Sequence, residues 1–175
     1  MNEAHEDQQL ILAAQQDPQA FAVLYEKYID RMYQFLYFRT GQNPETAEDM
    51  TAELFTRAFT QLSRFSWQGY PYSAYLYQVA RSLCVDYYRK HAIVVDVDAL
   101  ELQDDRSDTV MTQMDIQLLW KKIGVLPKSV QEMLELRYIE DLSFEEIGHI
   151  LGKKSGAIRT AVSRAIDRLQ KEYEI

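Results

Sequence analysis

Apolar residues recur at helical spacing in two blocks of the sequence, and a strongly acidic segment separates these blocks. In the first block the spacing runs from Phe21 to Leu36, and near the end of the chain it runs from Ile158 to Leu169. Residues 92–118 hold seven acidic side chains and one basic one. Six glycines and four prolines are few for an all-β protein of 175 residues. The pattern therefore predicts an all-α chain of two small helical domains joined by an acidic linker.

Capping signals place the helices of the first block. Asp17-Pro18 and Asn43-Pro44 each combine an N-cap residue with a proline at the first helical position, so a helix is expected after each pair. A third apolar stripe covers residues 76–87. Residues 65–75, just before it, contain a glycine and a proline and predict a loop.

The second block has the start and stop signals of a helix-turn-helix. Residues 111–123 and 128–138 predict two helices, the second with an inward stripe that includes Tyr138. Ser143 and Glu146 match the capping box, and Gly152 ends the short helix that follows it. A longer helix then begins near residue 155. In a helix-turn-helix the second helix enters the DNA major groove.

The last helix has a strongly basic face. Residues 153–171 hold six basic side chains against Asp167, a local charge of +5 in a chain of net charge −8. Arginine can bond guanine bidentately, and serine or threonine can reach a base edge or a phosphate. A solvated basic face on an ordinary amphipathic helix is the alternative, and the capped short helix in front of it favours DNA binding. The candidate DNA-contacting residues are Lys153, Lys154, Ser155, Arg159, Thr160, Ser163 and Arg164.

The sequence contains little that indicates an enzyme. Glu146 and His149 have the Glu-x-x-His spacing of helical di-metal sites, but such sites need a second copy of the motif. Cys84 and three scattered histidines give no zinc spacing, and there is no glycine-rich phosphate loop. We therefore expect no catalytic site, no metal and no cofactor.

Membrane and secretion signals are also missing from the sequence. The first residues are acidic, unlike the basic start of a signal peptide, and no stretch approaches about 18 uncharged apolar residues. The single cysteine cannot form an internal disulfide. We expect a cytoplasmic protein with no membrane insertion.

Two long stretches resemble one known family. The run from Leu126 to Ala165, with its Leu-Pro pair, capping box and basic last helix, closely resembles region 4 of bacterial extracytoplasmic-function sigma factors. Residues 47–65 resemble region 2.2 of that family, and residues 75–86 resemble its promoter-melting helix. The resemblance covers roughly residues 17–91 and 112–172, in the order that the family has.

The resemblance implies a sigma factor that directs core RNA polymerase to promoters and helps to open them. Residues 17–91 would be a region 2 domain for polymerase docking and for minus-ten recognition and melting. Residues 112–175 would be a region 4 domain for minus-thirty-five recognition, and residues 92–111 the acidic linker. Residues 1–16 contain three acidic and no basic side chains and are expected to form an acidic tail. The implied partners are promoter DNA and the clamp and flap regions of core polymerase, and a cognate anti-sigma factor is a candidate third.

The family also suggests which residues meet polymerase. Asp49, Glu53 and Arg57 would lie on the polymerase-facing side of their helix. Their spacing of four residues places them on one polar face. An intrahelical series of salt bridges on a solvated helix accounts for the same spacing, so the sequence leaves both interpretations open.

The loop before the melting helix is rich in aromatic residues. Aromatic faces stack on unpaired bases at ~1–3 kcal/mol each, so Trp67, Tyr70 and Tyr72 are candidates for trapping an extruded promoter base. At least one of the three is expected to plug the side of the helical core instead. Arg81 and Ser82, in the stretch that resembles the melting helix, complete the candidate minus-ten set.

A stand-alone helix-turn-helix regulator, with the first block as a sensor or dimerisation domain, is the alternative. In such a sensor, residues 48–59 and 75–86 would have no reason to resemble region 2 of the sigma factors. The acidity is also confined to the N-terminal segment and the linker. A free protein that is weakly attracted to DNA and gains promoter affinity on polymerase would have this distribution.

Overall fold

The protein is described here by a computed structural model that covers residues 3–91, 123–124 and 126–171. Contacts divide the chain into two compact units, Met1–Val94 (unit 1) and Val95–Ile175 (unit 2). The described residues are helical and include no strand, which confirms the all-α fold class. The predicted linker over residues 92–111 lies outside these residues, as does the helix predicted over 111–123 except for its last position.

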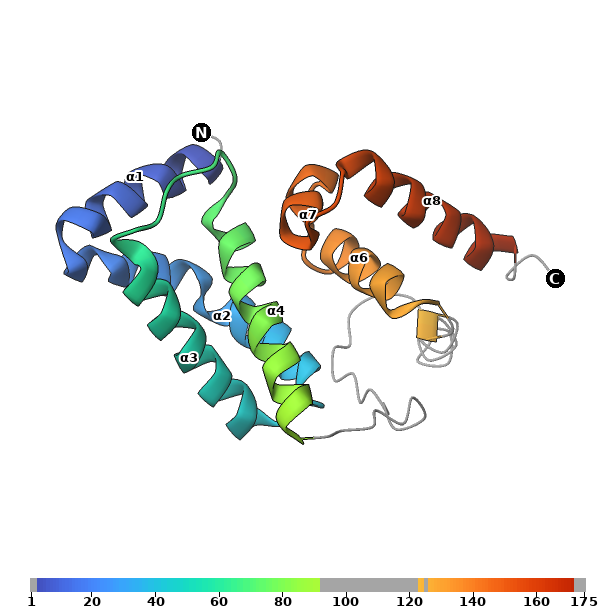
Figure 1. Cartoon of the computed structure of the whole chain (residues 1–175), viewed down its shortest axis with the longest axis horizontal. Helices are drawn as coiled ribbons and strands as arrows, with labels where there is room; N and C mark the ends of the chain where they lie inside the picture. Colours follow the sequence, from blue (N-terminus) through green and yellow to red (C-terminus); the bar gives the residue numbers. More distant parts are fainter. Residues whose placement is uncertain (1–2, 92–122, 125, 172–175) are drawn as a thin grey trace, which may run out of the picture. The chain divides into compact units, whose positions relative to one another are not determined.

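Unit 1 is a helical bundle (Figure 1). It contains α1 (Glu3–Gln16), the short 3-10 helix η1 (Pro18–Ala20), α2 (Phe21–Arg39), α3 (Pro44–Leu62) and α4 (Tyr72–His91). The Asp17 carboxylate accepts the backbone N–H of Gln19 at 3.0 Å, and the Asn43 side chain accepts that of Thr46 at 2.9 Å. These two bonds confirm the predicted caps and fix where η1 and α3 begin.

The apolar stripes of α2, α3 and α4 form the core of unit 1. The stripes predicted from the sequence are mostly buried, but Tyr25 stays 41% exposed, and Val79 and Tyr87 are half-buried. Aromatic rings fill much of the space: Phe35 and Tyr77 meet edge to face with their centroids 5.1 Å apart. The fully buried large side chains of this unit are Tyr28, Tyr72, Tyr77, Phe35, Leu24, Met32, Leu36, Leu54 and Leu76.

The acidic tail predicted for residues 1–16 is wrong, because residues 3–16 form α1 and pack against the bundle. Ala4, Asp7, Ile11 and Ala14 recur at helical spacing and are all buried. The prediction of a tail assumed that Asp7 is a solvated carboxylate. In the fold it is fully buried, and three polar partners from two other helices, α2 and α4, compensate its charge, as described below.

Unit 2 contains α6 (Lys128–Tyr138), α7 (Phe144–Leu151) and α8 (Ser155–Lys171). Its capping box is present as predicted: Glu146 N donates to Ser143 Oγ at 3.2 Å, and Ser143 N donates to the Glu146 carboxylate at 2.7 Å. Gly152 ends α7 with a φ of +64°, a backbone conformation that glycine adopts without strain. The buried side chains are Leu126, Met133, Leu134, Leu136, Leu142, Ile147, Ile150, Ile158, Val162 and Ala165.

The turn between α7 and α8 packs directly on α7. Lys153 N donates to the Gly148 carbonyl at 2.9 Å, and a Cβ atom on Gly148 would lie 2.6 Å from the Lys153 carbonyl oxygen. Only glycine therefore fits at position 148 without a shift of the turn. In α6 the stripe differs from prediction, since Leu136 is buried while Tyr138 is 61% exposed.

Candidate nucleic-acid interface

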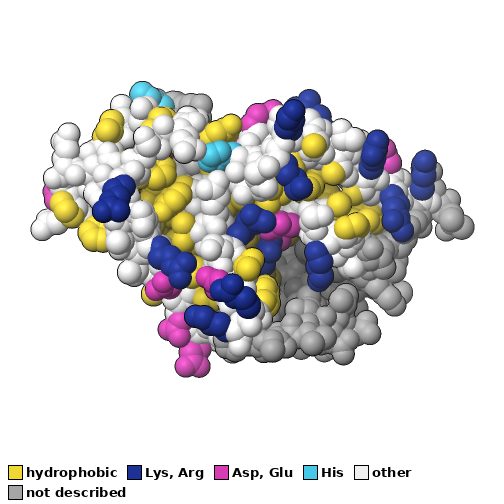
Figure 2. All heavy atoms as spheres, viewed as in Figure 1, with side chains coloured by type: hydrophobic (Ala, Val, Ile, Leu, Met, Phe, Trp, Pro, Cys, Tyr) yellow, Lys and Arg dark blue, Asp and Glu magenta, His cyan; other side chains and the backbone are white. Residues whose placement is uncertain are grey.

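The basic face of α8 is exposed to solvent. Its opposite face carries Ile158, Val162 and Ala165, which are buried against the rest of unit 2. Figure 2 shows dark-blue Lys and Arg side chains spaced along this unit. The exposed candidates are Lys153, Lys154, Arg159, Thr160, Ser163 and Arg164, with Ser155 half-buried at the start of the helix. The structure therefore brings all seven candidates together on α8 or the turn before it.

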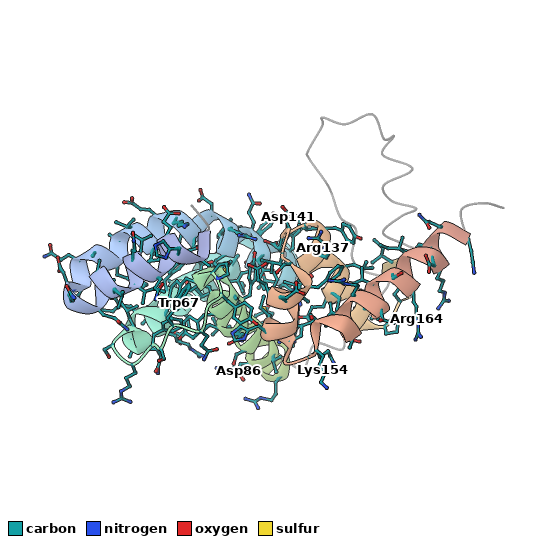
Figure 3. The ribbon with its side chains drawn as sticks, turned by 90° about the horizontal axis from the view of Figure 1, so that it is seen from above. Trp67, Asp86, Arg137, Asp141, Lys154 and Arg164 are labelled. Carbon is teal, nitrogen blue, oxygen red and sulfur yellow. The ribbon has the colours of Figure 1, made fainter. Side chains whose placement is uncertain are left out.

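α7 contributes two side chains that orient Arg159, and the sequence analysis did not single them out. The Arg159 guanidinium lies over the Phe144 ring at 5.2 Å, with its nitrogen 3.9 Å from the Glu145 carboxylate. Arg137 of α6 lies over the same ring at 5.3 Å. Its ion pair with Asp141, at 3.6 Å, can be followed in Figure 3. Phe144 therefore contacts two guanidinium groups from different helices, an attraction between cation and ring face.

Thr160 has its hydroxyl proton already engaged. The hydroxyl donates to the Gly156 carbonyl at 2.9 Å, within α8. A hydroxyl in this state still has an acceptor lone pair. Thr160 is thus suited to accept a hydrogen bond from a ligand, while the arginines and lysines supply the donors.

In unit 1 the polar face predicted on α3 is exposed. Asp49 and Glu53 are exposed and Arg57 is half-buried. Arg57 Nε donates to the Glu53 carboxylate at 2.7 Å. One pair of the predicted salt-bridge series is therefore present, and the same three side chains remain on a surface that a protein partner can reach.

The aromatic loop places its three candidates differently. Trp67, which is labelled in Figure 3, and Tyr70 are half-buried in the loop between α3 and α4. Tyr72 is fully buried as the first residue of α4, so the prediction that it stacks on a base is wrong. Its ring packs edge to face on Phe65 at 5.3 Å, and burial raises the pKa of its hydroxyl well above the ordinary value. Tyr72 is the aromatic residue that plugs the core.

An open groove of about 390 Å³ lies between α3 and α4. Arg57 lines it from α3, and Ser82 lines it from α4. Arg57 was predicted to bind polymerase and Ser82 to bind DNA, whereas the fold places both residues on the same groove. Burial raises the pKa of Tyr75, which also lines the groove, so it presents a neutral hydroxyl there.

Arg81 and Asp86 complete the candidate surface of α4. Arg81 is half-buried, next to the exposed Ser82. Asp86 forms an ion pair with Arg89 at 2.9 Å. This pairing reduces the repulsion that a free carboxylate at position 86 would exert on a phosphate backbone.

Two further observations concern the described residues. No described helix is long and apolar enough to cross a membrane. No group of three or more His, Cys, Asp or Glu side chains within the described ranges is placed to hold a metal ion.

Comparisons with known proteins match both units. The family model of sigma-70 region 2 matches residues 24–93, and that of sigma-70 region 4 matches residues 116–169. The chain is 30% identical over 170 residues to the ECF RNA polymerase sigma factor SigW of Bacillus subtilis, covering 89% of this chain and 90% of SigW. It is 33% identical to the ECF RNA polymerase sigma factor BldN of Streptomyces coelicolor, but spans only 59% of that protein's length.

A solved structure shares the fold. CnrH, determined in complex with the cytosolic domain of CnrY, superposes with a TM-score of 0.65 at 20% identity, covering 96% of this chain and 97% of that one. Two helical units with these motifs define a sigma factor of the sigma-70 class. The chain belongs to the ECF RNA polymerase sigma factors.

Proposed function

We propose that this protein directs core RNA polymerase to specific promoters and helps to open them. The observation that carries the proposal is the exposed basic face of α8, mounted on a capped helix-turn-helix in the same chain as the region 2 bundle. In this scheme α8 enters the major groove at the minus-thirty-five element. Arg159 and Arg164 supply donors for guanine, and Lys153 and Lys154 anchor the phosphates.

Unit 1 provides the polymerase and minus-ten surfaces in this proposal. Asp49, Glu53 and Arg57 face the clamp from α3, with the Glu53–Arg57 pair opening to meet charges on polymerase. The minus-ten element meets Trp67 and Tyr70 on the loop and Arg81 and Ser82 on α4; Tyr72 is not part of this set. Stacking on Trp67 and Tyr70 offsets the cost of unstacking a promoter base.

A protein regulator is a further proposed partner. Unit 1 exposes several large apolar side chains, which suits a surface that another protein covers. The solved relative CnrH is in complex with the cytosolic domain of CnrY. The exposed apolar residues are Leu12, Val23, Tyr25, Phe38, Phe59 and Val85.

We propose the cytoplasm as the site of action, because polymerase and promoter DNA are there.

Run-off transcription with purified core polymerase on a promoter library tests the function. We expect promoter-dependent transcripts only when the protein and core polymerase are both present. No promoter-dependent initiation, together with tight sequence-specific DNA binding by the isolated chain, would establish a stand-alone regulator instead.

A further inference from the structure

The loop between α3 and α4, residues 63–71, runs alongside α1 in the fold (Figure 1). It carries Trp67 and Tyr70, the two aromatic residues left in the proposed minus-ten set. A loop that contains Gly69, with a φ of +84°, has considerable conformational freedom unless other parts of the chain hold it. Besides ring contacts with α4, it is held by side chains of α1, a helix with no part in the proposed polymerase or DNA surfaces.

Gln15 of α1 holds the beginning of the loop. Its Nε2 donates to two backbone carbonyls, those of Leu62 and Phe65, each at 2.9 Å. Leu62 is the last residue of α3, and Phe65 is the third residue after it. One side-chain amide therefore ties the end of α3 and the start of the loop to the same point on α1.

Asp7 of α1 holds the other end of the loop. Its Oδ2 accepts the backbone N–H of Tyr72, the first residue of α4, at 2.7 Å. The same oxygen accepts the Tyr28 hydroxyl at 2.5 Å, and Oδ1 accepts Lys27 Nζ at 2.8 Å. A fully buried carboxylate with three donors has no freedom to move. Its negative charge also lies at the N-terminus of α4, where the helix dipole favours it.

We propose that α1 is a positioning element for the minus-ten loop, with Gln15 and Asp7 fixing its two ends so that Trp67 and Tyr70 are presented in one arrangement. The inference rests on the proposed function of that loop. Gln15 and Asp7 lie eight residues apart on α1 and touch no promoter base in this scheme. They are positioning residues, acting through the loop. Preorganisation of this kind reduces the ordering cost of binding.

Gln15 offers the sharper test, because its neighbour Gln16 is a matched control on the same helix. Q15E keeps the shape of the side chain and removes the donor, and Q16E makes the same change at the next position, which is exposed as Gln15 is. In a Trp120→Phe background, Trp67 is the single tryptophan of the chain. Acrylamide quenching of Trp67 then reports on the loop in the free protein, at a temperature where circular dichroism shows equal helix content.

We expect Q15E to raise the fraction of molecules in which the loop has moved away from α1 by about three- to tenfold. Trp67 should then be more accessible to acrylamide, while Q16E should match the parent. Q15A, which removes the donor without adding charge, should follow Q15E. Equal quenching in Q15E and Q16E would overturn the proposal. Global loss of helix in both Gln15 variants would overturn it as well, since Gln15 would then support the bundle and not the loop.

Transcription by the reconstituted holoenzyme links the loop to promoter use. On promoters selected by the parent protein, Q15E should lose about three- to tenfold of the discrimination between the selected and a substituted minus-ten base, with minus-thirty-five discrimination unchanged. Q16E should keep both. If the parent itself gives no promoter-dependent transcript, the proposed function fails. If the parent is active and Q15E keeps its minus-ten preference, the inference alone fails.

Discussion

The two units of this protein position their functional side chains by different means. In unit 1, side-chain hydrogen bonds connect residues far apart in the sequence: Asp7 with Tyr72 and Gln15 with Leu62 and Phe65. In unit 2, the corresponding bonds join near neighbours, such as Ser143 with Glu146 and Arg137 with Leu142. Unit 2 is therefore organised by local sequence signals, whereas unit 1 depends on how its helices assemble.

The largest expected effect is at the most distant connection. Asp7→Ala leaves the Tyr28 hydroxyl and the Tyr72 N–H without their buried acceptor, so we expect unfolding of unit 1 to become easier by about 3 kcal/mol. Hydrogen exchange should show lost protection in α1, the loop and the start of α4, with unit 2 unchanged. Glu6→Ala is the control: Glu6 also pairs with Lys27, at 3.0 Å, but it is exposed, and its loss should cost about 0–1 kcal/mol. Equal effects of the two variants would show that unit 1 does not depend on the buried long-range hydrogen bonds of Asp7.

The tight turn of unit 2 gives a local counterpart. Gly148→Ala forces a methyl group against the Lys153 carbonyl, and we expect it to destabilise unit 2 by about 1–3 kcal/mol in urea unfolding. Gly156→Ala, in the first turn of α8 with open space around the new methyl, should be neutral or stabilising by up to about 1 kcal/mol. Equal stability of the Gly148 and Gly156 variants would show that the turn moves aside without cost.

Base reading by α8 is expected to depend on position along the helix. Arg159→Ala and Arg164→Ala should each cost about 1–3 kcal/mol of promoter discrimination at the upstream element, because each removes a proposed bidentate donor to guanine. Lys171→Ala removes one charge at the last position of α8 and should weaken binding without changing sequence preference. Transcription competition between selected and substituted upstream elements measures both. Retained upstream preference in both arginine variants would show that the face is wrongly assigned.

The smallest effect at neutral pH is expected at Tyr72. Its buried hydroxyl has no hydrogen-bond partner in the described part of the chain, so Tyr72→Phe should change stability by less than about 1 kcal/mol at pH 7. Above pH 10 the stabilities of the parent protein and Tyr72→Phe should differ. The pKa of Tyr72 is raised from 10.0 by burial and by Tyr75, so the folded protein keeps a proton that the unfolded chain loses.

The resulting stability is complete below pH 10 and falls as the pH rises beyond it. Tyr72→Phe should remove much of this alkaline loss in denaturant unfolding between pH 9 and 11. A smaller dependence should remain, because the pKa of Tyr75 is raised by burial. The pKa of Lys27 is also raised, since its hydrogen bonds and attraction to Asp7 and Glu6 outweigh the opposing effect of its burial. An unchanged pH profile in Tyr72→Phe would show that this tyrosine is accessible to solvent.

Sequence alone determined the elements that depend on nearest neighbours. The caps at Asp17 and Asn43, the capping box at Ser143 and the glycine stop at residue 152 all form as predicted, because each joins groups within a few residues. The exposed face of α8 follows from helical period in the same way.

Tertiary structure decided which side chains are left for partners. Ala4, Ile11 and Ala14 have the apolar spacing of a helix and indicate α1. The acidic side chains among residues 1–16 led instead to the prediction of a tail. Nothing in the sequence distinguishes Tyr72 from Trp67 as a candidate for base stacking. Only the packing of α4 against the bundle buries Tyr72 and leaves Trp67 half-buried. Likewise, nothing local pairs Gln15 with Leu62 and Phe65, which follow it by 47 and 50 residues. The physical reason is that burial and long-range hydrogen bonds are properties of assembled helices, whereas caps and periodicity are properties of a single one.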